Sequence, residues 1–440
     1  MKTAVIGAGF AGLAAADELA KAGHQVVVWE KFKKAGGMSA GFSADDWRWT
    51  AEHHYHDIFA SDHHVLNWVE RLELADQVEF TPAVSAGYRQ KQINRLDSPV
   101  SLLLHPQLSF MAKLRTAAGL GFCKLRPNGL SLERWTAAEF IQTVMGRESW
   151  EKLWQPLFAG KFGAAADQIN AAWFWARIHT RSQRLGYFKG GFQRLADLAV
   201  KKLFDQGVKF QFQTKVSRIK QTRSGWELTA KPLNSKKTAV NQAGSFYFDQ
   251  VLFTGHSREL VQISPDLPDW YQQQLKKLTG LGAVSLLLEL DEPLLPDDTY
   301  WLNINQPDWP FLAVVEHTNL VSPDHYGHKH LVYAGNYLPA ADPLYDLDKQ
   351  ELFDRYLPYL RQLNPGYDFT HNLNGCYLFK TEFAQPVVKT NHSRILPKTS
   401  TPLSGLYWAG IEQVYPYDRG INYAVKIGRE AASLVDESCK

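Results

Sequence analysis

Ala-Val-Ile-Gly-Ala-Gly-Phe-Ala-Gly, at residues 4–12, is the stretch that decides the fold of this chain. Gly7, Gly9 and Gly12 form a G-x-G-x-x-G pattern between an apolar strand and a helical segment at residues 13–22. The first glycine makes the tight turn, the second lets backbone approach a pyrophosphate, and the third lets the helix sit close to the strand. The pattern therefore predicts a βαβ unit with a phosphate-binding turn.

A second apolar run, at residues 25–29, ends on the acidic residue Glu30, which Lys31 follows. An acid at this position accepts hydrogen bonds from a ribose. Phe10 and Ala11 lie inside the glycine motif, and the helix after it offers free N–H groups and a positive dipole end to phosphates. The sequence thus predicts a bound dinucleotide. The alternative is a glycine-rich turn in an ordinary βαβ unit.

Composition narrows the class of protein. The chain has 440 residues, 45% hydrophobic and 21% charged, which indicates a soluble protein of two domains. A net charge of +3 gives no reason to expect a nucleic-acid partner. Cys123, Cys376 and Cys439 are widely spaced, so we expect no disulfide frame, no metal site and a cytoplasmic location. No apolar run approaches the roughly 18 residues that span a bilayer.

Residues 98–132 depart from the average composition, because they contain no acidic residue. Many apolar residues accompany four basic ones, Lys113, Arg115, Lys124 and Arg126. One interpretation is a surface that makes weak peripheral contact with an anionic membrane. The interpretation that we favour is the packed helical part of a substrate domain. Glycines and a proline are expected to prevent a long amphipathic helix: Gly119, Gly121, Pro127 and Gly129.

Periodicity outlines the rest of the chain. Helices are predicted at residues 62–75, 131–160, 193–204 and 421–434. Strands are predicted at residues 208–212, 283–290 and 406–409, with a β meander at 223–253 that contains a polar loop near 232–244. The fold class is α/β. We expect a discontinuous nucleotide domain from residues 1–80, 185–260 and 395–440, and an inserted α+β substrate domain from residues 81–184 and 261–394.

Three further stretches fit the opening motif. Gly36-Gly37 follows Glu30, Gly190-Gly191-Phe192 precedes a helix and the strand 215–219, and residues 405–412 lead to Gly420 and the last helix. In this order, the chain resembles the flavin amine oxidase superfamily, which includes protoporphyrinogen oxidases, carotenoid desaturases and amine oxidases. The resemblance implies a Rossmann-like FAD-binding domain of the glutathione reductase type, with FAD held non-covalently.

The resemblance also implies roles for particular residues. The Gly36-Gly37 turn, followed by Met38, would pack along the pyrophosphate and ribityl chain of FAD, and Val216 would meet the adenine through its backbone. An acidic residue after Gly410, here Glu412, would lie near the ribityl–phosphate chain. The last helix would direct its N-terminus at flavin N1 and O2, where its dipole stabilises the reduced anion. Its first residues are Gly420, Ile421 and Asn422.

The sequence departs from the family in two places. Met38 stands where an arginine is common, and residues 283–290 lack the lysine that amine oxidases carry there. The missing lysine argues against oxidation of amines. A local resemblance to UDP-galactopyranose mutase covers residues 56–62, in which His56 is the candidate for contact with the flavin or for proton transfer.

Candidates for the substrate cavity come from two regions. Alternation from Trp173 to His179 would place Trp173, Trp175 and Arg177 on one face of a strand, as an aromatic wall with a cation. If the segment is helical, these residues scatter and are mostly core. Tyr377 is a further candidate.

The sequence thus predicts an FAD-dependent oxidoreductase that transfers hydride from a hydrophobic or amphipathic small molecule to flavin N5. Two alternatives stay open. One is a redox-neutral mutase that acts on a sugar nucleotide. The other is a non-enzymatic binder of lipidated proteins, similar to the GDP dissociation inhibitors. The retained phosphate cradle argues against the binder.

Overall fold

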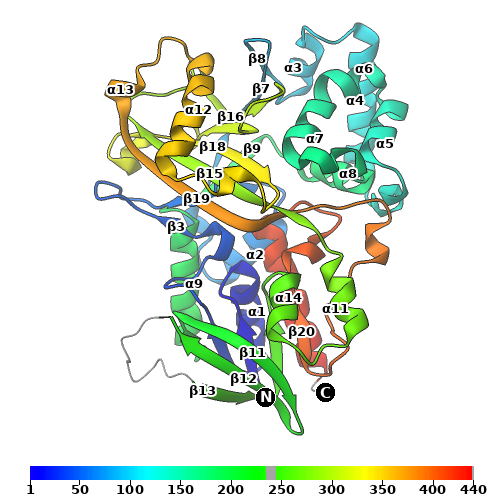
Figure 1. Cartoon of the computed structure of the whole chain (residues 1–440), viewed down its shortest axis with the longest axis vertical. Helices are drawn as coiled ribbons and strands as arrows, with labels where there is room; N and C mark the ends of the chain where they lie inside the picture. The colour runs from blue at the N-terminus through cyan, green and yellow to red at the C-terminus, as the bar shows by residue number, and fades with distance from the viewer. Residues whose placement is uncertain (234–243, 439–440) are drawn as a thin grey trace.

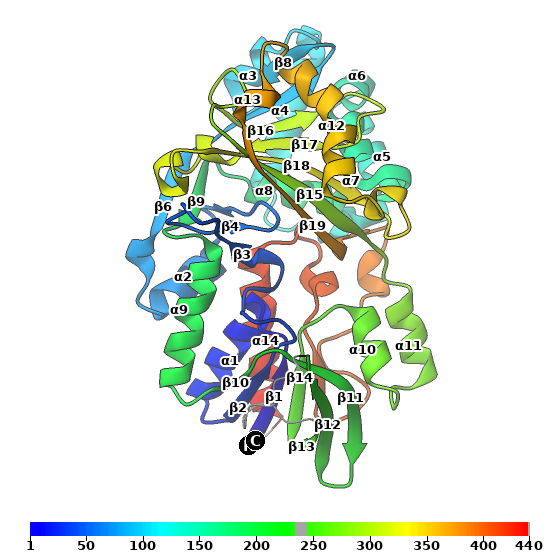
Figure 2. The same cartoon turned by 60° about the vertical axis from the view of Figure 1, so that its left-hand side comes forward.

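A five-stranded parallel sheet lies in the lower half of the molecule (Figure 2). The computed structural model describes residues 1–233 and 244–438, so Cys439 and most of the polar loop predicted near 232–244 lie outside the described residues. The strand order is β10 (Lys209–Gln211), β2 (Gln25–Trp29), β1 (Lys2–Ile6), β14 (Gln250–Phe253) and β20 (Leu406–Trp408). The chain thus returns to one sheet from four separate regions.

Alternation along β1 explains how this sheet is covered. Val5 packs against helices on one face, whereas Ala4 and Ile6 pack against an antiparallel sheet on the other. The helices are α1 (Phe10–Lys21), α2 (His63–Arg71), α9 (Phe192–Asp205) and α14 (Ile421–Glu437). The antiparallel sheet is β11 (Thr214–Thr222), β12 (Gly225–Pro232) and β13 (Gly244–Phe248). The predicted helices at 62–75, 193–204 and 421–434 are confirmed. The meander predicted at 223–253 is confirmed in part, because residues 250–253 form β14 of the parallel sheet instead.

A seven-stranded sheet forms part of the upper half (Figure 1). All its neighbouring strands are antiparallel except β16 and β7, which run parallel. Its order is β19 (Leu373–Pro386), β15 (Gly280–Leu290), β18 (His330–Leu338), β17 (Ala313–Glu316), β16 (Thr299–Ile304), β7 (Val84–Arg89) and β8 (Gln92–Arg95). Helix α12 (Lys349–Leu363) covers its outer face with Leu352, Tyr356 and Leu360.

Six helices form a lobe beside this sheet, at the upper right of Figure 1. They are α3 (Pro99–Leu104), α4 (Phe110–Leu125), α5 (Ala137–Val144), α6 (Arg147–Ser149), α7 (Gln155–Phe162) and α8 (Ala171–Thr180). The single helix predicted at 131–160 was wrong, because Gly146 has a φ of +98° and ends α5. The expected interruption at Gly119 and Gly121 was also wrong, since α4 runs through both.

Residues 171–180 form a helix and not the strand considered from the sequence. The Asn170 side chain accepts a hydrogen bond from the backbone N–H of Trp173 and caps the helix. Alanines at positions 171, 172 and 176 favour the helix. The alternation of large residues was therefore coincidental.

Shorter elements connect these units. They are β3 (Gly41–Phe42), β4 (Ala51–Glu52), β5 (Ile58–Phe59), β6 (Val78–Pro82), β9 (Arg184–Phe188), α10 (Ser257–Ile263), α11 (Asp269–Lys276) and α13 (Phe369–Asn372). Across the described residues, every helix is too short or too polar to span a bilayer.

Candidate functional site

One cavity of about 1810 Å³ runs through the molecule. It begins at the glycine turn after β1, passes between the parallel sheet and the seven-stranded sheet, and ends against α4, α7 and α8. Ligand sites usually occupy about 300–1,000 Å³. The cavity is therefore large enough for a dinucleotide and a second molecule.

The glycine turn has the geometry that the motif predicts. Gly7 has a φ of +107°, a conformation that favours glycine. A Cβ on Gly12 would lie 1.9 Å from the carbonyl oxygen of Gly7, so only glycine allows the helix to approach the strand. Phe10 and Ala11 line the cavity at the start of α1, as does Gly7.

The backbones of Gly9 and Gly37 approach each other closely in the wall of the cavity. A Cβ on Gly9 would lie 3.7 Å from the Gly37 Cα, and a Cβ on Gly37 would lie 2.9 Å from the Gly9 Cα. Gly36 donates its backbone N–H to the carbonyl oxygen of Ala8 at 2.9 Å, which fixes this approach. Met38 also lines the cavity. Two bare stretches of backbone thus border the path in which a pyrophosphate would lie.

Glu30 lies at the end of β2 and lines the cavity. Its Oε2 accepts a hydrogen bond from the backbone N–H of Ala8 at 2.8 Å, and its Oε1 accepts one from that of Phe32 at 2.9 Å. Burial raises the pKa of Glu30, and the two backbone donors oppose this rise. The carboxylate is therefore held in place, with lone pairs left for ribose hydroxyls. Lys31 lines the cavity beside it.

Two further cofactor candidates line the cavity. Val216 does so from β11, beside β2, and the N-terminus of α14 does so through Gly420 and Ile421. The first hydrogen bond of α14 joins the Ala424 N–H to the Gly420 carbonyl oxygen at 3.0 Å. The N–H groups of the first turn have no partner within the helix and are free to bind a flavin edge.

Three cofactor candidates, Gly410, Glu412 and Asn422, are not among the residues that line the cavity. A Cβ on Gly410 would meet the Trp408 indole at 2.5 Å, so packing requires this glycine. Glu412 accepts a hydrogen bond from the backbone N–H of Ser257 at 2.8 Å, at the start of α10, and is not among the residues that line the large cavity. Asn422 accepts a hydrogen bond from the backbone N–H of Val65 at 3.1 Å and so joins α14 to α2.

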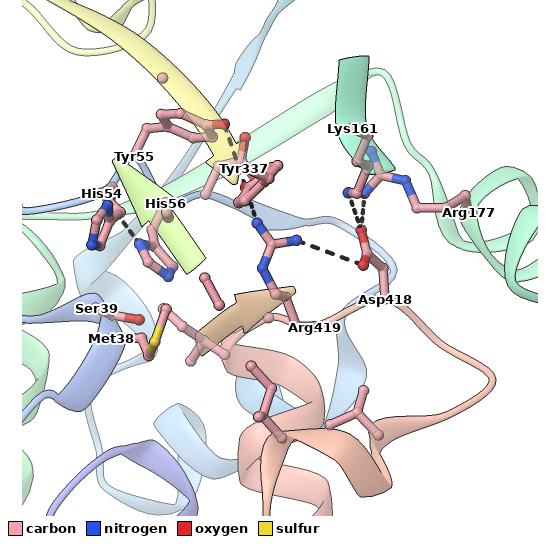
Figure 3. A pocket seen from close by; sticks show the side chains of 18 of the residues that line it. Met38, Ser39, His54, Tyr55, His56, Lys161, Arg177, Tyr337, Asp418 and Arg419 are labelled. Carbon is pink, nitrogen blue, oxygen red and sulfur yellow. Dashed lines mark hydrogen bonds and ion pairs between the residues drawn. The ribbon is translucent and has the colours of Figure 1, made fainter. Parts of the chain in front are cut away.

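The histidine segment after β4 lies over Met38 and Ser39 (Figure 3). His56 Nδ1 lies 2.6 Å from the carbonyl oxygen of His54, which can only accept, so Nδ1 donates and Nε2 keeps its lone pair. Burial lowers the pKa of His56 to about 4 and that of His54 to about 3. Both imidazoles are therefore neutral near pH 7.

Asp418 holds a cluster of cations beside the histidines (Figure 3). Its Oδ2 lies 3.0 Å from Lys161 Nζ and 2.9 Å from a guanidinium nitrogen of Arg177. Its Oδ1 lies 3.6 Å from Arg419, which also donates a hydrogen bond to the Tyr337 hydroxyl. Burial raises the pKa of Asp418, but the two ion pairs outweigh it and lower the value overall. One ionised carboxylate thus serves three cations.

Burial also lowers the pKa of several cations in the cavity. It lowers the pKa of Lys161 to about 7, although the ion pair with Asp418 opposes this. It lowers the pKa of Arg419 and that of Arg181 to about 10. Arg181 donates a hydrogen bond to Ser85 Oγ at 2.8 Å. Each of these side chains lines the cavity.

The structure divides the substrate candidates into two pairs. Trp173 and Arg177 lie four residues apart on α8 and line the cavity, and both contact Asp418. Trp175, on another face of α8, donates a hydrogen bond to the carbonyl oxygen of Arg126 at 3.1 Å and is absent from the cavity lining. Tyr377 donates to Glu289 at 2.9 Å and is likewise absent from it. The placement of Trp175 and Tyr377 in the cavity wall was therefore wrong.

Sequence reasoning missed several residues of this site: Lys161, Arg181, Tyr337, Asp418 and Arg419. Asp418 and Arg419 directly precede Gly420, so the motif at the last helix was a signal for them. Nothing in the sequence around Lys161 or Tyr337 marks them, because they reach the cavity from the helical lobe and from β18. Ser285, on β15, lines the cavity and bonds His54 at 2.8 Å.

These residues fit the FAD that the sequence implies. The bare backbones of Gly9 and Gly37 lie side by side at the glycine turn, Glu30 presents a fixed carboxylate, and the first turn of α14 presents free donors. They would hold the pyrophosphate, the ribose and the flavin edge, respectively. Cys376 lies on β19 and does not line the cavity.

Comparison with known proteins agrees with this fit. The model of the flavin-containing amine oxidoreductase family matches residues 10–436. The fold is similar to a putative protoporphyrinogen oxidase from Exiguobacterium sp. 255-15, with a TM-score of 0.75, 17% identity and coverage of 99% of this chain and 98% of that one. No curated protein matches the chain.

Two other solved structures share the fold at low identity. A reduced UDP-galactopyranose mutase has a TM-score of 0.73 at 14% identity, covering 99% of this chain and 95% of that one. Cyclohexylamine oxidase from Brevibacterium oxydans IH-35A has a TM-score of 0.70 at 15% identity, covering 100% of this chain and 99% of that one. The chain belongs to the flavin-containing amine oxidoreductase family, and it is an FAD-dependent oxidoreductase.

Proposed function

We propose that this enzyme oxidises an amphipathic small molecule that carries an anionic group. The observation that carries the proposal is the single cavity, which joins the glycine cradle to an apolar arm and has the Asp418 cation cluster between them. Bound FAD supplies the hydride acceptor, at N5. The residues of the chain then need to orient the substrate, exclude water and accept a proton.

The apolar arm supports a hydrophobic body for the substrate. Aliphatic and aromatic side chains of α3, α4, α7 and α8 line it: Leu102, Leu120, Leu157, Phe158, Phe174 and Ile178. No compensating donors are needed for an apolar ligand there, and its burial is favoured by about 25 cal/mol per Å². This arm excludes water from the reacting carbon.

The positive charge in the middle of the cavity supports an anionic group on the substrate. Lys161, Arg177, Arg181 and Arg419 line the middle of the cavity, and the carboxylates that interact with them are Asp57, Asp97 and Asp418. Burial raises the pKa of Asp57, which limits the negative charge that it contributes. A carboxylate or phosphate on the substrate would restore the balance and accept bonds from Arg177 and Arg181.

His56 is the side chain that we assign to proton transfer. It lines the cavity, its Nδ1 is committed to the carbonyl oxygen of His54, and its Nε2 is an acceptor. A neutral imidazole takes up a proton without first losing one. His56→Gln should lower the rate of flavin reduction by about 10²-fold while flavin content is unchanged, in line with the loss of one general base.

The test is anaerobic bleaching of the flavin. Protoporphyrinogen, which bears carboxylates on an apolar ring system, represents the proposed class, and benzylamine and spermine represent cationic amines. Amines should reduce the flavin poorly, because β15 offers no lysine and the cavity already holds excess positive charge. Rapid reduction by spermine with none by anionic amphipaths would overturn the proposal.

A redox-neutral mutase is the second candidate. The segment that resembles UDP-galactopyranose mutase contributes His56, Asp57 and Phe59 to the cavity lining, and the neighbouring Arg177 and Arg181 suit a diphosphate. If dithionite-reduced enzyme interconverts the ring forms of UDP-galactose, the mutase reaction replaces the oxidase reaction.

A further inference from the structure

Helices α3 and α4 present an unusually apolar outer surface, which we call the α3–α4 face. Its apolar residues are Val100, Leu103, Leu104, Phe110, Met111, Leu114, Phe122 and Leu125. Leu104 is 75% exposed, Phe110 is 73% exposed and Leu125 is 86% exposed. Large apolar side chains are seldom this exposed together on a monomer without a partner surface.

The concentration of these residues is specific to this face. Of the 17 large hydrophobic residues that are exposed in the described parts of the chain, ten lie between Val100 and Trp135. The other seven are scattered: Met1, Phe32, Phe204, Leu233, Tyr247, Trp270 and Leu434. Scattered residues need no explanation, whereas a contiguous group indicates a binding surface.

The same face is basic. Residues 98–132 contain no acid, and Lys113, Arg115 and Arg126 form no ion pair with a described carboxylate. Lys124 instead lines the cavity and donates to the carbonyl oxygens of His179 and Arg181. Arg115 bonds the carbonyl oxygen of Thr143, and Arg126 bonds that of Asn128. Glu148, which accepts hydrogen bonds from Ser109 at the start of α4, is paired with Lys152. The positive charge of the face is therefore not neutralised locally.

The opposite faces of the two helices line the cavity. Leu102 of α3 and Leu120 of α4 point into the apolar arm, whereas Leu104 and Leu125 point outward. Both helices therefore lie between the apolar arm and the outer face. A partner that binds to the α3–α4 face would thus lie against the wall of the cavity.

We propose that the α3–α4 face docks on an anionic lipid bilayer. Basic side chains bind the lipid headgroups, and the exposed apolar side chains insert between them, as in other interfacial helices. A second copy of this chain is disfavoured as the occupant, because two such faces would bring like charges together. The docking surface does not depend on the substrate, and it extends the proposed function by giving an amphipathic substrate a short path from the membrane.

The test is co-sedimentation of the FAD-loaded protein with vesicles. Phosphatidylcholine vesicles that contain phosphatidylglycerol should retain the protein at low salt, and phosphatidylcholine vesicles alone should not. High salt should weaken binding, since exposed charges are screened. A variant with Leu104→Ser, Phe110→Ser and Leu125→Ser, and a second with Lys113→Ser, Arg115→Ser and Arg126→Ser, should each bind at least about tenfold more weakly.

A matched control removes equally exposed apolar residues elsewhere. Phe204→Ser with Trp270→Ser, on α9 and α11, should bind vesicles as the wild type does. Flavin content and melting temperature report whether each variant is folded. If wild-type protein stays in the supernatant with anionic vesicles at low salt, or if the control loses binding as much as the face variants, the proposal is wrong. Dimerisation that the face variants abolish, without vesicle binding, would also overturn it. Since no turnover is measured, these outcomes are independent of the reaction.

Discussion

The two ends of the cavity are built in different ways. The nucleotide end consists of glycine backbone, one carboxylate and helix N-termini, all within or near short sequence motifs. The substrate end consists of side chains from α4, α7, α8, β15, β18 and the segment before α14, and no single motif joins them. Backbone recognition constrains sequence tightly, because only glycine permits the close approach. Side-chain recognition tolerates many sequences that keep the same shape and charge.

The largest expected effect tests the nucleotide end. Gly9→Val should lower FAD affinity by more than about 100-fold, because the side chain would cover the backbone of the glycine turn, where the pyrophosphate is expected. Flavin absorbance after gel filtration measures the loss. Gly244→Val is the control, since a Cβ there meets only the Phe246 ring, at 3.9 Å. Full flavin content in Gly9→Val would refute the placement of the cofactor.

The next prediction tests the substrate end of the cavity independently of the nucleotide end. Arg177→Gln should leave flavin content unchanged and weaken binding of laurate, an anionic amphipath, by about 10- to 100-fold, as the loss of a charged hydrogen bond predicts. Perturbation of the flavin spectrum measures laurate binding. Arg71→Gln, which removes an ion pair with Glu18 between α2 and α1, is the control, because neither residue lines the cavity. Unchanged laurate affinity in Arg177→Gln would place the anion site elsewhere.

A smaller effect concerns pH. Since burial lowers the pKa of Lys161 to about 7, the cavity loses one positive charge as pH rises from 6 to 8, while Arg419, with a pKa of about 10, stays charged and His54 and His56 stay neutral. Laurate affinity should therefore fall by about tenfold over this range, equivalent to one pKa unit. Lys161→Met should flatten this dependence, and Lys152→Met should keep it. An equal slope in both variants would rule out Lys161 as the titrating group.

The smallest expected effect concerns Tyr377, which the structure places outside the cavity lining. Tyr377→Phe removes a hydrogen bond to Glu289 outside the cavity and should lower the free energy of unfolding by about 0.5–1.5 kcal/mol. Urea unfolding measures this change. Laurate affinity and flavin content should stay at wild-type values. A loss of laurate binding in this variant would return Tyr377 to the substrate site.

The sequence predicted the parts of the fold in which local pattern and backbone chemistry coincide. Gly7, Gly12 and Glu30 lie as the motif requires, and the helix at residues 421–434 appears as α14. Prediction failed in the helical lobe. Gly146 divided one expected helix, and the Asn170 cap made a helix of a segment that alternates like a strand.

By itself, then, the sequence determined the nucleotide fold and its phosphate turn, because close approach and a free N–H depend on residues that are neighbours in the chain. Only the tertiary structure decided the substrate end. Lys161 and Arg177 lie 257 and 241 residues from Asp418 in the chain, yet both pair with its carboxylate. Burial in a common cavity sets their charge and their pKa, and burial depends on packing between elements that are distant in the sequence.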